Sequence, residues 1–261
     1  MNLIQSILLG LIQGIVEWLP ISSEGQSMLF MIEFLNISAN EAFSIAIFLH
    51  LGTMLAVILK FRTKFIALFK PKSNSQLLKI LVISTLSTGV TAIPLFFIVK
   101  KTFTRGDTIM LLIGVMLILT GVILRLQSTE KKAYKNMEEM RIRDMFFLGL
   151  AQGFSILPGV SRSGTTITFL LMDKMNQKDA LEISFLISVP AVAGAIVLNM
   201  LTSPSLPVAS WSNAITMISA SFIAGYATMG ALLRFAERIN FSKFCIVLGL
   251  LTVVFAIFSL L

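Results

Sequence analysis

The sequence has few charged residues for its length. Asp, Glu, Lys and Arg make up 13% of its 261 residues, whereas a soluble domain carries about 25%. Hydrophobic residues make up 56%, and the mean hydropathy is +0.90. A soluble domain of this size could bury a large core, but its surface would need about twice this charge. The sequence therefore predicts a polytopic membrane protein.

Histidine and cysteine each occur once, as His50 and Cys245. One cysteine can form neither an intrachain disulfide nor a thiolate metal cluster. One histidine in an apolar run is typical of a hydrogen-bonding residue in helix packing, so His50 is only a distant site candidate. It supports neither a Ser-His-Asp site nor a mechanism that needs two histidines. The chain also lacks a glycine-rich P-loop ending in Gly-Lys-Ser/Thr.

Long runs without a charged side chain dominate what is present. They cover residues 42–59, 80–99, 108–124, 145–161, 183–233 and 244–261. About 20 apolar residues cross a bilayer as a helix, so most runs predict one span each. The longest run must turn once, and we expect the turn in the Pro- and Ser-rich stretch 202–213. The N-terminus has neither a basic segment nor a small-residue cleavage site, so we expect it to be retained.

Basic residues lie beside the apolar runs and account for the net charge of +8. Lys and Arg are enriched in the cytoplasmic loops of membrane proteins. Residues 60–79 and 125–143 each carry six of them, whereas 34–41 and 202–212 carry none. We therefore expect the first two segments to be cytoplasmic and the last two to be external. This pattern explains the positive charge without nucleic-acid binding.

The sequence contains a weak internal repeat. "GLIQGIVEWLPISSEG" at residues 10–25 resembles "GLAQGFSILPGVSRSG" at residues 149–164, with Gly-Leu-x-Gln-Gly, then Leu-Pro, then serines and a glycine. Proline and glycine break both copies. Weak repeats with broken helices are typical of inverted-repeat transporters, whose site lies at the repeat interface.

These features predict an all-α fold, a polytopic membrane helical bundle with two inverted repeats. Repeat one covers about 1–124 and repeat two about 144–261, and the charged loop 125–143 joins them in one integral membrane domain, 1–261. Each repeat is expected to contain a re-entrant or broken helix hairpin. Non-helical backbone at membrane depth is tolerated only where it is buried or lines a wet cavity.

Each predicted hairpin contains one ionised side chain in uncharged surroundings. Glu17 is the only charge in residues 1–23, and Arg162 is the only one in residues 145–172. A charge at membrane depth costs about 2.5–3.5 kcal/mol on insertion scales and usually marks function. The alternative is a structural ion pair that locks the repeats together. In either case we expect the two side chains to meet.

The residues around Arg162 favour an anion site. Its guanidinium offers a planar fork of donors that suits phosphate oxygens. Pro158 and Gly159 end one helix, and Ser161 can cap the next, whose first amides would point at an anion. Hydroxyl groups follow at Ser163, Thr165 and Thr166, and the first hairpin mirrors them with Ser22 and Ser23. One such hydroxyl alone could be a helix cap, but the cluster beside an arginine favours phosphate binding.

These motifs resemble those of the undecaprenyl-diphosphate phosphatases, also called the bacitracin-resistance family. Gln13 and Glu17 match the first family motif, in which Glu or Gln is followed four residues later by Glu. The second motif, Pro-Gly-x-Ser-Arg-Ser-x-x-Thr, matches residues 158–166 in full. The resemblance spans essentially the whole chain and includes "LPISS" (19–23), "FLHLGTMLAV" (48–57) and "SFLISVPAVAGA" (184–195).

The resemblance implies hydrolysis of a long-chain polyprenyl (undecaprenyl-type) diphosphate to the monophosphate and inorganic phosphate. This reaction recycles a lipid carrier of cell-wall or glycan assembly. The implied partners are the polyprenyl diphosphate lipid and the membrane, with no nucleic acid, and the oligomeric state stays open. A divalent cation, Mg or Ca, is a candidate cofactor, and no organic cofactor is expected.

The resemblance also implies roles for individual residues. Glu17 would act in acid–base or metal chemistry, Ser23 would be the candidate nucleophile, and Arg162 would hold the phosphates. The implied substrate-binding residues are Gln13, Ser22, Gln26, Ser161, Ser163 and Thr166.

One position departs from the family pattern. Where the family commonly reads Ser-Ser-Thr-Gly-His, this chain reads "SSEGQ" at residues 22–26. Gln26 can donate and accept hydrogen bonds, but it cannot shuttle a proton near neutral pH. An acid–base role would then fall on a carboxylate, with Glu17 first and Glu24 second. Glu24 could also be a metal ligand with Glu17, or an exposed charge at a hairpin tip.

The alternative function is a polyprenyl-phosphate transporter or flippase that uses the same midplane anion site. The departure at Gln26 favours this alternative. Phosphoryl transfer mainly requires positioning and charge neutralisation, which an arginine, a glutamate and several hydroxyls can supply, so the enzyme is the leading hypothesis. A purely structural membrane protein would not account for the two motifs.

Overall fold

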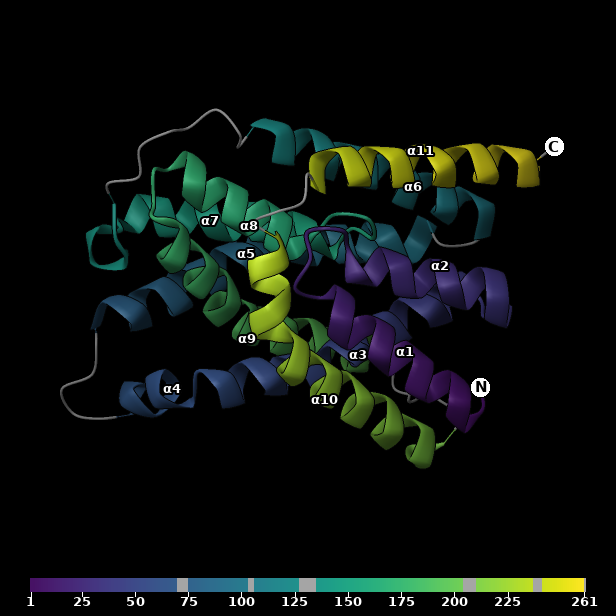
Figure 1. The fold of residues 1–261 in the computed structure, drawn as a ribbon, viewed down its shortest axis with the longest axis horizontal. Coiled ribbons are helices and arrows are strands. Elements are labelled where there is room, and N and C mark those ends of the chain that lie inside the picture. The colour runs from purple at the N-terminus through teal and green to yellow at the C-terminus, as the bar shows by residue number, and fades with distance from the viewer. Residues whose placement is uncertain (70–74, 103–105, 127–134, 204–209, 237–240, 261) are drawn as a thin grey trace.

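The computed structural model describes residues 1–69, 75–102, 106–126, 135–203, 210–236 and 241–260. These residues form helices and contain no β-strand (Figure 1). Four described segments, Ala39–Lys60, Gln76–Thr102, Gln177–Thr202 and Trp211–Ala231, are long and apolar enough to cross a membrane. The prediction of an all-α, polytopic membrane bundle is confirmed.

The helices follow the predicted apolar runs. The first half of the chain contains α1 (Leu3–Val16), α2 (Ser23–Leu35), α3 (Ala39–Lys60), α4 (Arg62–Leu68), α5 (Ser75–Thr102) and α6 (Gly106–Leu126). The second half contains η2 (Met137–Glu139), α7 (Ile142–Gly153), η3 (Phe154–Ile156), α8 (Arg162–Met172), α9 (Gln177–Thr202), α10 (Trp211–Ala236) and α11 (Phe241–Leu260). The turn expected within 202–213 lies between α9 and α10, partly outside the described residues.

Part of the loop expected at 60–79 is helical. Residues 62–68 form α4, directly after α3. Lys64 of α4 forms an ion pair with Glu182 of α9, and this pair holds the short helix against the second half of the chain. Residues 70–74 of the same loop lie outside the described residues.

The two motif segments form helical hairpins that are too short to cross a bilayer. Helices α1 and α2 have 14 and 13 residues, and α7 and α8 have 12 and 11. At 1.5 Å per residue these helices are about 16–21 Å long, against a hydrocarbon core of about 30 Å. The break in each hairpin falls at the Leu-Pro sequence, as predicted, because proline cannot continue a helix.

The hairpins extend toward opposite ends of the molecule, and their tips meet near its middle. Figure 1 shows α1 and α2 reaching to the right and α7 and α8 to the left. The first helix of each hairpin packs on a long helix of the other half, α1 on α10 and α7 on α5. The two hairpins therefore make equivalent packing contacts with the other half of the chain, as we expect of an internal repeat. The inverted relation of the repeats across a membrane, and their boundaries, stay predictions.

Small residues allow these two helix crossings to be close. A Cβ at Gly10 of α1 would lie 2.5 Å from the Met217 carbonyl oxygen of α10. A Cβ at Gly149 of α7 would lie 2.2 Å from the Ser84 carbonyl oxygen of α5. Gly10 and Gly149 are equivalent in the repeat, so the same small residue serves the same contact twice. Such positions let helix backbones approach each other in membranes.

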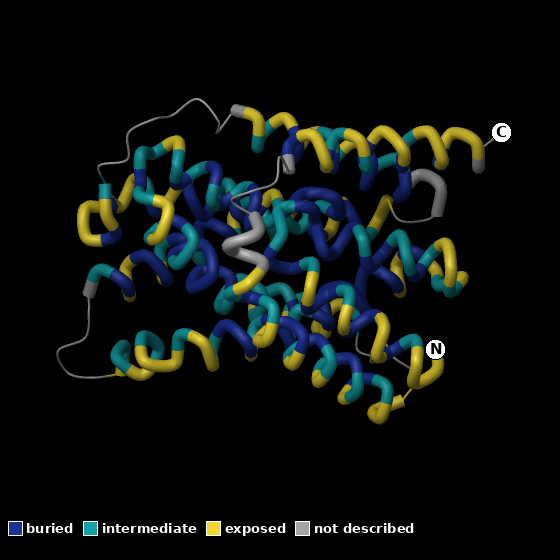
Figure 2. Tube along the Cα trace, viewed as in Figure 1, coloured by how far each residue is buried: buried dark blue, intermediate teal, exposed yellow. Residues whose placement is uncertain are grey.

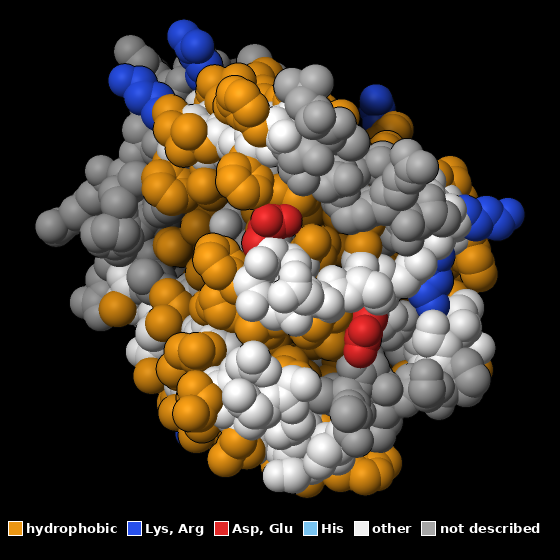
Figure 3. All heavy atoms as spheres, turned by 90° about the vertical axis from the view of Figure 1, so that its right-hand side faces the viewer, with side chains coloured by type: hydrophobic (Ala, Val, Ile, Leu, Met, Phe, Trp, Pro, Cys, Tyr) orange, Lys and Arg blue, Asp and Glu red, His pale blue; other side chains and the backbone are white. Residues whose placement is uncertain are grey.

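Buried residues concentrate where the hairpin tips meet, and the outer helices carry exposed apolar side chains (Figure 2). On α11, Val247, Leu251 and Phe255 are 56%, 62% and 57% exposed and share one face at a spacing of four residues. Figure 3 shows one end of the molecule, where apolar side chains lie among polar and acidic ones and basic side chains lie toward the rim. Lipid chains match the apolar face of α11, whereas water does not.

Lys135 ties the segment between the two halves to the second hairpin. Its side chain forms ion pairs with Asp144 at the start of α7 and Asp173 at the end of α8. Its carbonyl oxygen accepts a hydrogen bond from the Asn176 amide at 2.9 Å. Burial lowers the pKa of Lys135, but hydrogen bonds to the two carboxylates outweigh it and hold this pKa above its ordinary value. The outer end of the second hairpin is therefore anchored at neutral pH.

We expect Gly10→Ala to lower the thermal stability of the protein, because the added Cβ would meet the α10 backbone. Overpacking of this kind costs about 1–3 kcal/mol. Gly194→Ala on α9 is the matched control, since nothing lies within 4 Å of a Cβ there. Thermal unfolding of both variants in detergent gives the comparison, and equal midpoints would contradict the close α1–α10 packing.

Candidate active site

Glu17 lies at the end of α1 and contacts side chains from three other helices. Its Oε1 accepts a hydrogen bond from Arg162 Nη2 at 2.5 Å. Its Oε2 accepts hydrogen bonds from Ser23 Oγ at 2.6 Å and from Gln13 Nε2 at 2.8 Å. His50 Nε2 lies 3.3 Å from the same Oε2 atom. Glu17 is 6% exposed, so the two ions that the sequence predicts to meet do so in a buried site.

Trp18 fixes the position of Glu17 beside it. The Trp18 indole donates a hydrogen bond to the Gly225 carbonyl oxygen of α10 at 3.0 Å. Its ring also packs edge-on against Phe185 of α9, with ring centroids 5.4 Å apart. A buried indole needs such a partner for its N–H group. The residue after Glu17 is therefore held between two helices of the second half.

Arg162 is the first residue of α8, directly after the N-cap Ser161, whose Oγ accepts a hydrogen bond from the Gly164 amide. Arg162 Nη1 donates to the Ser184 carbonyl oxygen of α9 at 3.1 Å, while Nη2 donates to Glu17. Thr166 Oγ1 donates to the Arg162 carbonyl oxygen at 2.8 Å and lies 2.7 Å from Ser184 Oγ. Thr166 thus supports the packing of α8 on α9 behind Arg162.

Ser22 joins the two hairpin tips. Its Oγ accepts hydrogen bonds from the Gly25 amide at 3.3 Å and from the Gly159 amide of the second hairpin at 3.1 Å. Ser22 has a φ of 59° and Gly159 a φ of 100°. Positive φ values are unfavourable for most residues and mark a tightly constrained backbone, often at functional sites. The hydroxyl group of Ser22 therefore holds together two tight turns, of which the one at Ser22 is strained and the one at Gly159 uses the freedom of glycine.

A small cavity of about 20 Å³ lies between the tips. It is lined by Glu17, Leu19, Ser22, Ser23, Glu24, His50, Ser155, Val160, Ser161, Arg162 and Ser163. The structure thus brings together the predicted catalytic residues Glu17, Ser23 and Arg162 and the predicted binding residues Ser22, Ser161 and Ser163. Hydroxyl groups and a guanidinium make its lining rich in hydrogen-bond donors, which suits an anion.

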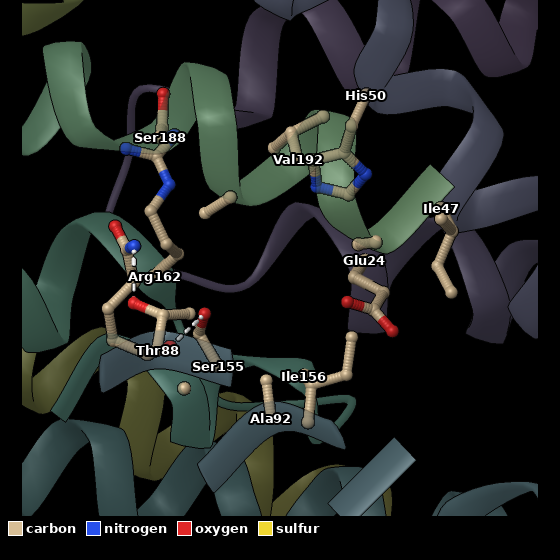
Figure 4. Close-up of a pocket in the computed structure, with 14 residues that line it drawn as sticks. Glu24, Ile47, His50, Thr88, Ala92, Ser155, Ile156, Arg162, Ser188 and Val192 are labelled. Carbon is tan, nitrogen blue, oxygen red and sulfur yellow. Dashed lines mark hydrogen bonds between the residues drawn. The ribbon is translucent and has the colours of Figure 1, made fainter. Parts of the chain in front are cut away.

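A larger cavity of about 90 Å³ adjoins the small one, and both are lined by Glu24, His50, Ser155 and Arg162. Figure 4 shows Arg162, Thr88 and Ser155 on one side and Glu24 and His50 on the other. Its apolar lining consists of Ile47, Ala92, Ile156, Ala191, Val192 and Ala195. A cavity that combines an apolar lining with an arginine suits an amphiphile with an anionic head group.

Three predicted binding residues line neither cavity and have other roles in this structure: Thr166, which packs behind Arg162, Gln13 and Gln26. Gln13 is fully buried and positions Glu17 by donating to its carboxylate. Gln26 Nε2 donates to the Ile21 carbonyl oxygen at 3.3 Å, and Gln26 is not among the residues lining either cavity. A substrate-binding role for Gln26 stays a prediction that no contact here supports.

Metal binding fits Glu17 poorly. Within the described ranges, no group of three or more His, Cys, Asp or Glu side chains could hold a metal ion. Both oxygens of Glu17 already accept hydrogen bonds from protein donors. Glu24 is 8% exposed, so the interpretation of Glu24 as an exposed charge at a hairpin tip is wrong. Its buried Oε1 has no hydrogen-bond partner, and its metal role stays a prediction.

His50 is the site residue that sequence reasoning underrated. The expected packing hydrogen bond is present, because Nδ1 lies 2.7 Å from the Ala46 carbonyl oxygen. The other ring nitrogen faces Glu17, and His50 lines both cavities. The signal was available in the sequence, since His50 is an ionisable group within the uncharged run 42–59, and such groups in membranes are usually functional.

The helices that can cross a membrane define an integral membrane protein. An arginine, a carboxylate and serine hydroxyls line a small cavity between its two broken helices. Residues 6–254 match the model of the bacitracin resistance protein BacA. The chain therefore belongs to the BacA family, and the resemblance seen in its motifs is confirmed.

Curated relatives cover almost the whole chain. An undecaprenyl-diphosphatase of Methanothrix thermoacetophila is 50% identical over 252 residues, which are 97% of this chain and 96% of the relative. A protein of the same name from Methanococcoides burtonii is 37% identical, covering 97% of this chain and 98% of its own length. The undecaprenyl-diphosphatase of Methanopyrus kandleri is 36% identical, covering 94% of this chain and 92% of its own length.

We expect Ser22→Ala to destabilise the protein, because the Gly25 and Gly159 amides would lose their acceptor. Leaving buried donors unpaired costs about 1–3 kcal/mol. Ser27→Ala is the matched control, since the Ser27 hydroxyl is also buried but has no hydrogen-bond partner. Thermal unfolding should show a lower midpoint for Ser22→Ala only. A loss of stability in Ser27→Ala alone would refute this account of the hairpin contact.

Proposed function

We propose that this protein hydrolyses a long-chain polyprenyl diphosphate of the undecaprenyl type to the monophosphate and inorganic phosphate. The observation that carries the proposal is the cluster of Ser23, Glu17 and Arg162 where the hairpin tips meet. The names of the relatives, undecaprenyl-diphosphatase, support it. The reaction would recycle the lipid carrier of cell-wall or glycan assembly at the cell membrane.

Ser23 and Glu17 are arranged as nucleophile and general base. Ser23 Oγ donates to Glu17 Oε2 at 2.6 Å, so the carboxylate can take the proton as the oxygen attacks the terminal phosphorus. A water in the position of this hydroxyl would be activated by the same base. Ser23 is also the first residue of α2, where unpaired backbone amides favour a phosphate.

Arg162 supplies the charge that phosphoryl transfer requires. Its guanidinium borders both cavities and forms an ion pair with Glu17. An incoming phosphate competes with Glu17 for this guanidinium, because both are anions with more than one oxygen that can accept its hydrogen bonds. Binding would thus neutralise the phosphate and at the same time release Glu17 Oε1, which makes the carboxylate a better base.

The larger cavity is the place for the part of the lipid next to the diphosphate. Arg162 lies on one side of it (Figure 4), and its apolar lining comes from α3, α5, η3 and α9. Burial of isoprenoid carbon against this lining contributes about 25 cal/mol per Å². The cavity thereby favours a diphosphate attached to an apolar chain over a water-soluble one.

A divalent cation, Mg or Ca, belongs to this proposal as a charge partner of the diphosphate. Glu24 offers a buried carboxylate oxygen that has no protein partner. Phosphate oxygens and water would supply the remaining oxygen ligands that such hard cations prefer. No organic cofactor is part of the proposal.

We expect Glu17→Gln to lower the rate of phosphate release from undecaprenyl diphosphate by at least about 100-fold, while lipid binding is retained. The variant keeps the shape of the side chain and removes the base.

Arg162→Lys should also lose most activity although it folds, because lysine keeps the charge but not the two-pronged geometry. Gln26→His is the control and should be tolerated or mildly activating. The measurement is phosphate release by purified protein in detergent, alongside lipid binding.

Full hydrolysis by Glu17→Gln would remove Glu17 from the catalytic role. The alternative function is a polyprenyl-phosphate transporter. It is supported by the two hairpins, whose helix N-termini lie at one site, as in transporters with broken helices. If the wild type and Gln26→His both bind the lipid but release no phosphate, the transporter should replace the enzyme.

We also propose that residues 60–79 and 125–143 face the cytoplasm and that 34–41 and 202–212 are external. In intact cells, on a Cys245→Ser background, an impermeant thiol reagent should label Ser38→Cys but not Glu138→Cys. Both positions are exposed, so the difference reports the side of the membrane. External labelling of Glu138→Cys would overturn this topology and the inversion of the repeats.

A further inference from the structure

His50 makes two hydrogen-bonding contacts, one with each ring nitrogen. Nδ1 lies 2.7 Å from the Ala46 carbonyl oxygen, and Nε2 lies 3.3 Å from Glu17 Oε2. A carbonyl oxygen only accepts hydrogen bonds, so Nδ1 carries a hydrogen. An ionised carboxylate also only accepts, so a second hydrogen must lie on Nε2 or on Glu17. The contact of these two atoms at 3.3 Å is therefore favourable when one proton lies between His50 and Glu17.

This shared proton lies next to the attacking group. Ser23 Oγ donates to the same atom, Glu17 Oε2, that faces His50. Ser23, Glu17 and His50 thus form a continuous line from the first turn of α2 through the end of α1 to α3. The other charged groups that face His50 across the two cavities are Glu24 and Arg162.

His50 also lies next to the position of the leaving group. It lines the small cavity, where Ser23 and Arg162 meet the terminal phosphate, and the larger cavity, where the apolar chain would lie. The oxygen that bridges the two phosphates must sit between these cavities. Gln26, by contrast, bonds the Ile21 backbone and cannot carry a proton near neutral pH.

We propose that His50 is the proton-transfer residue of this site, an inference that rests on the proposed hydrolysis. As the attacking oxygen bonds to the terminal phosphorus, its proton passes to Glu17. The bond from that phosphorus to the bridging oxygen breaks, and the electron pair leaves on the lipid monophosphate. His50 donates its Nε2 proton to that oxygen, and Glu17 then returns a proton to His50.

The same pair completes the reaction when Ser23 is the nucleophile. Water then attacks the phosphoserine, the bond from phosphorus to Ser23 Oγ breaks, and inorganic phosphate leaves. The pair of His50 and Glu17 takes up the proton of the water, and Glu17, which contacts Ser23, delivers a proton to Ser23 Oγ. In sum, one water is consumed and the protein returns to its starting protonation.

His50→Gln tests the proposal, because glutamine can still donate a hydrogen bond to Glu17 but cannot transfer a proton. For undecaprenyl diphosphate we expect kcat to fall by at least about 100-fold with little change in KM. Ser44→Ala is the matched control, since Ser44 lies on the same helix and bonds Asn199 at 3.2 Å outside the site. It should keep wild-type kcat.

A kcat of His50→Gln close to that of the wild type would overturn the inference while the proposed hydrolysis stands. A wild type that releases no phosphate would overturn both. If His50→Gln does not fold, nitrogen NMR of ¹⁵N-histidine-labelled wild type decides, since the chain contains one histidine. We expect a protonated Nδ1 and an Nε2 signal that shifts in Glu17→Gln. An Nε2 signal unaffected by Glu17→Gln would overturn the proposal.

Discussion

The ion pair between Glu17 and Arg162 is the interaction on which the centre of the molecule depends. Each ion comes from a different hairpin; Glu17 is buried and Arg162 is largely shielded from solvent. A buried charge without its partner costs several kcal/mol, and the attraction compensates only where the geometry is good and the remaining hydrogen bonds are made. Those hydrogen bonds come from Ser23, from Gln13 and, on the arginine side, from the Ser184 carbonyl group. The tips of both hairpins must therefore meet for either ion to be tolerated.

Several features of the backbone make this meeting feasible. Hairpin helices of 11 to 14 residues end inside the bundle, so their N-terminal amides and strained turns are buried. Ser22 compensates by accepting hydrogen bonds from both tips. Gly10 and Gly149 let the first helix of each hairpin lie directly on a long helix of the other half. Irregular backbone at this depth is stable only because protein surrounds it.

The arrangement that neutralises the buried charges also prepares the chemistry. A carboxylate that accepts a hydrogen bond from a serine hydroxyl is already placed as its base, and a guanidinium held beside it is already placed for an anion. His50 extends this network to a fourth helix, α3, and places an imidazole beside the carboxylate. The larger cavity adds an apolar surface beside these polar groups.

The sequence by itself determined the fold class, the helices and the two ions of the site. Uncharged runs require membrane helices, Leu-Pro breaks require interrupted ones, and an isolated Glu17 and Arg162 require a partner. Tertiary structure decided which atoms those ions contact. In the folded protein Gln26 donates to the Ile21 carbonyl group, and Thr166 packs behind Arg162. Glu24 is buried, and His50 lies beside Glu17. These contacts join residues on different helices, and their distances depend on helix crossings and side-chain rotamers, which no local sequence pattern contains.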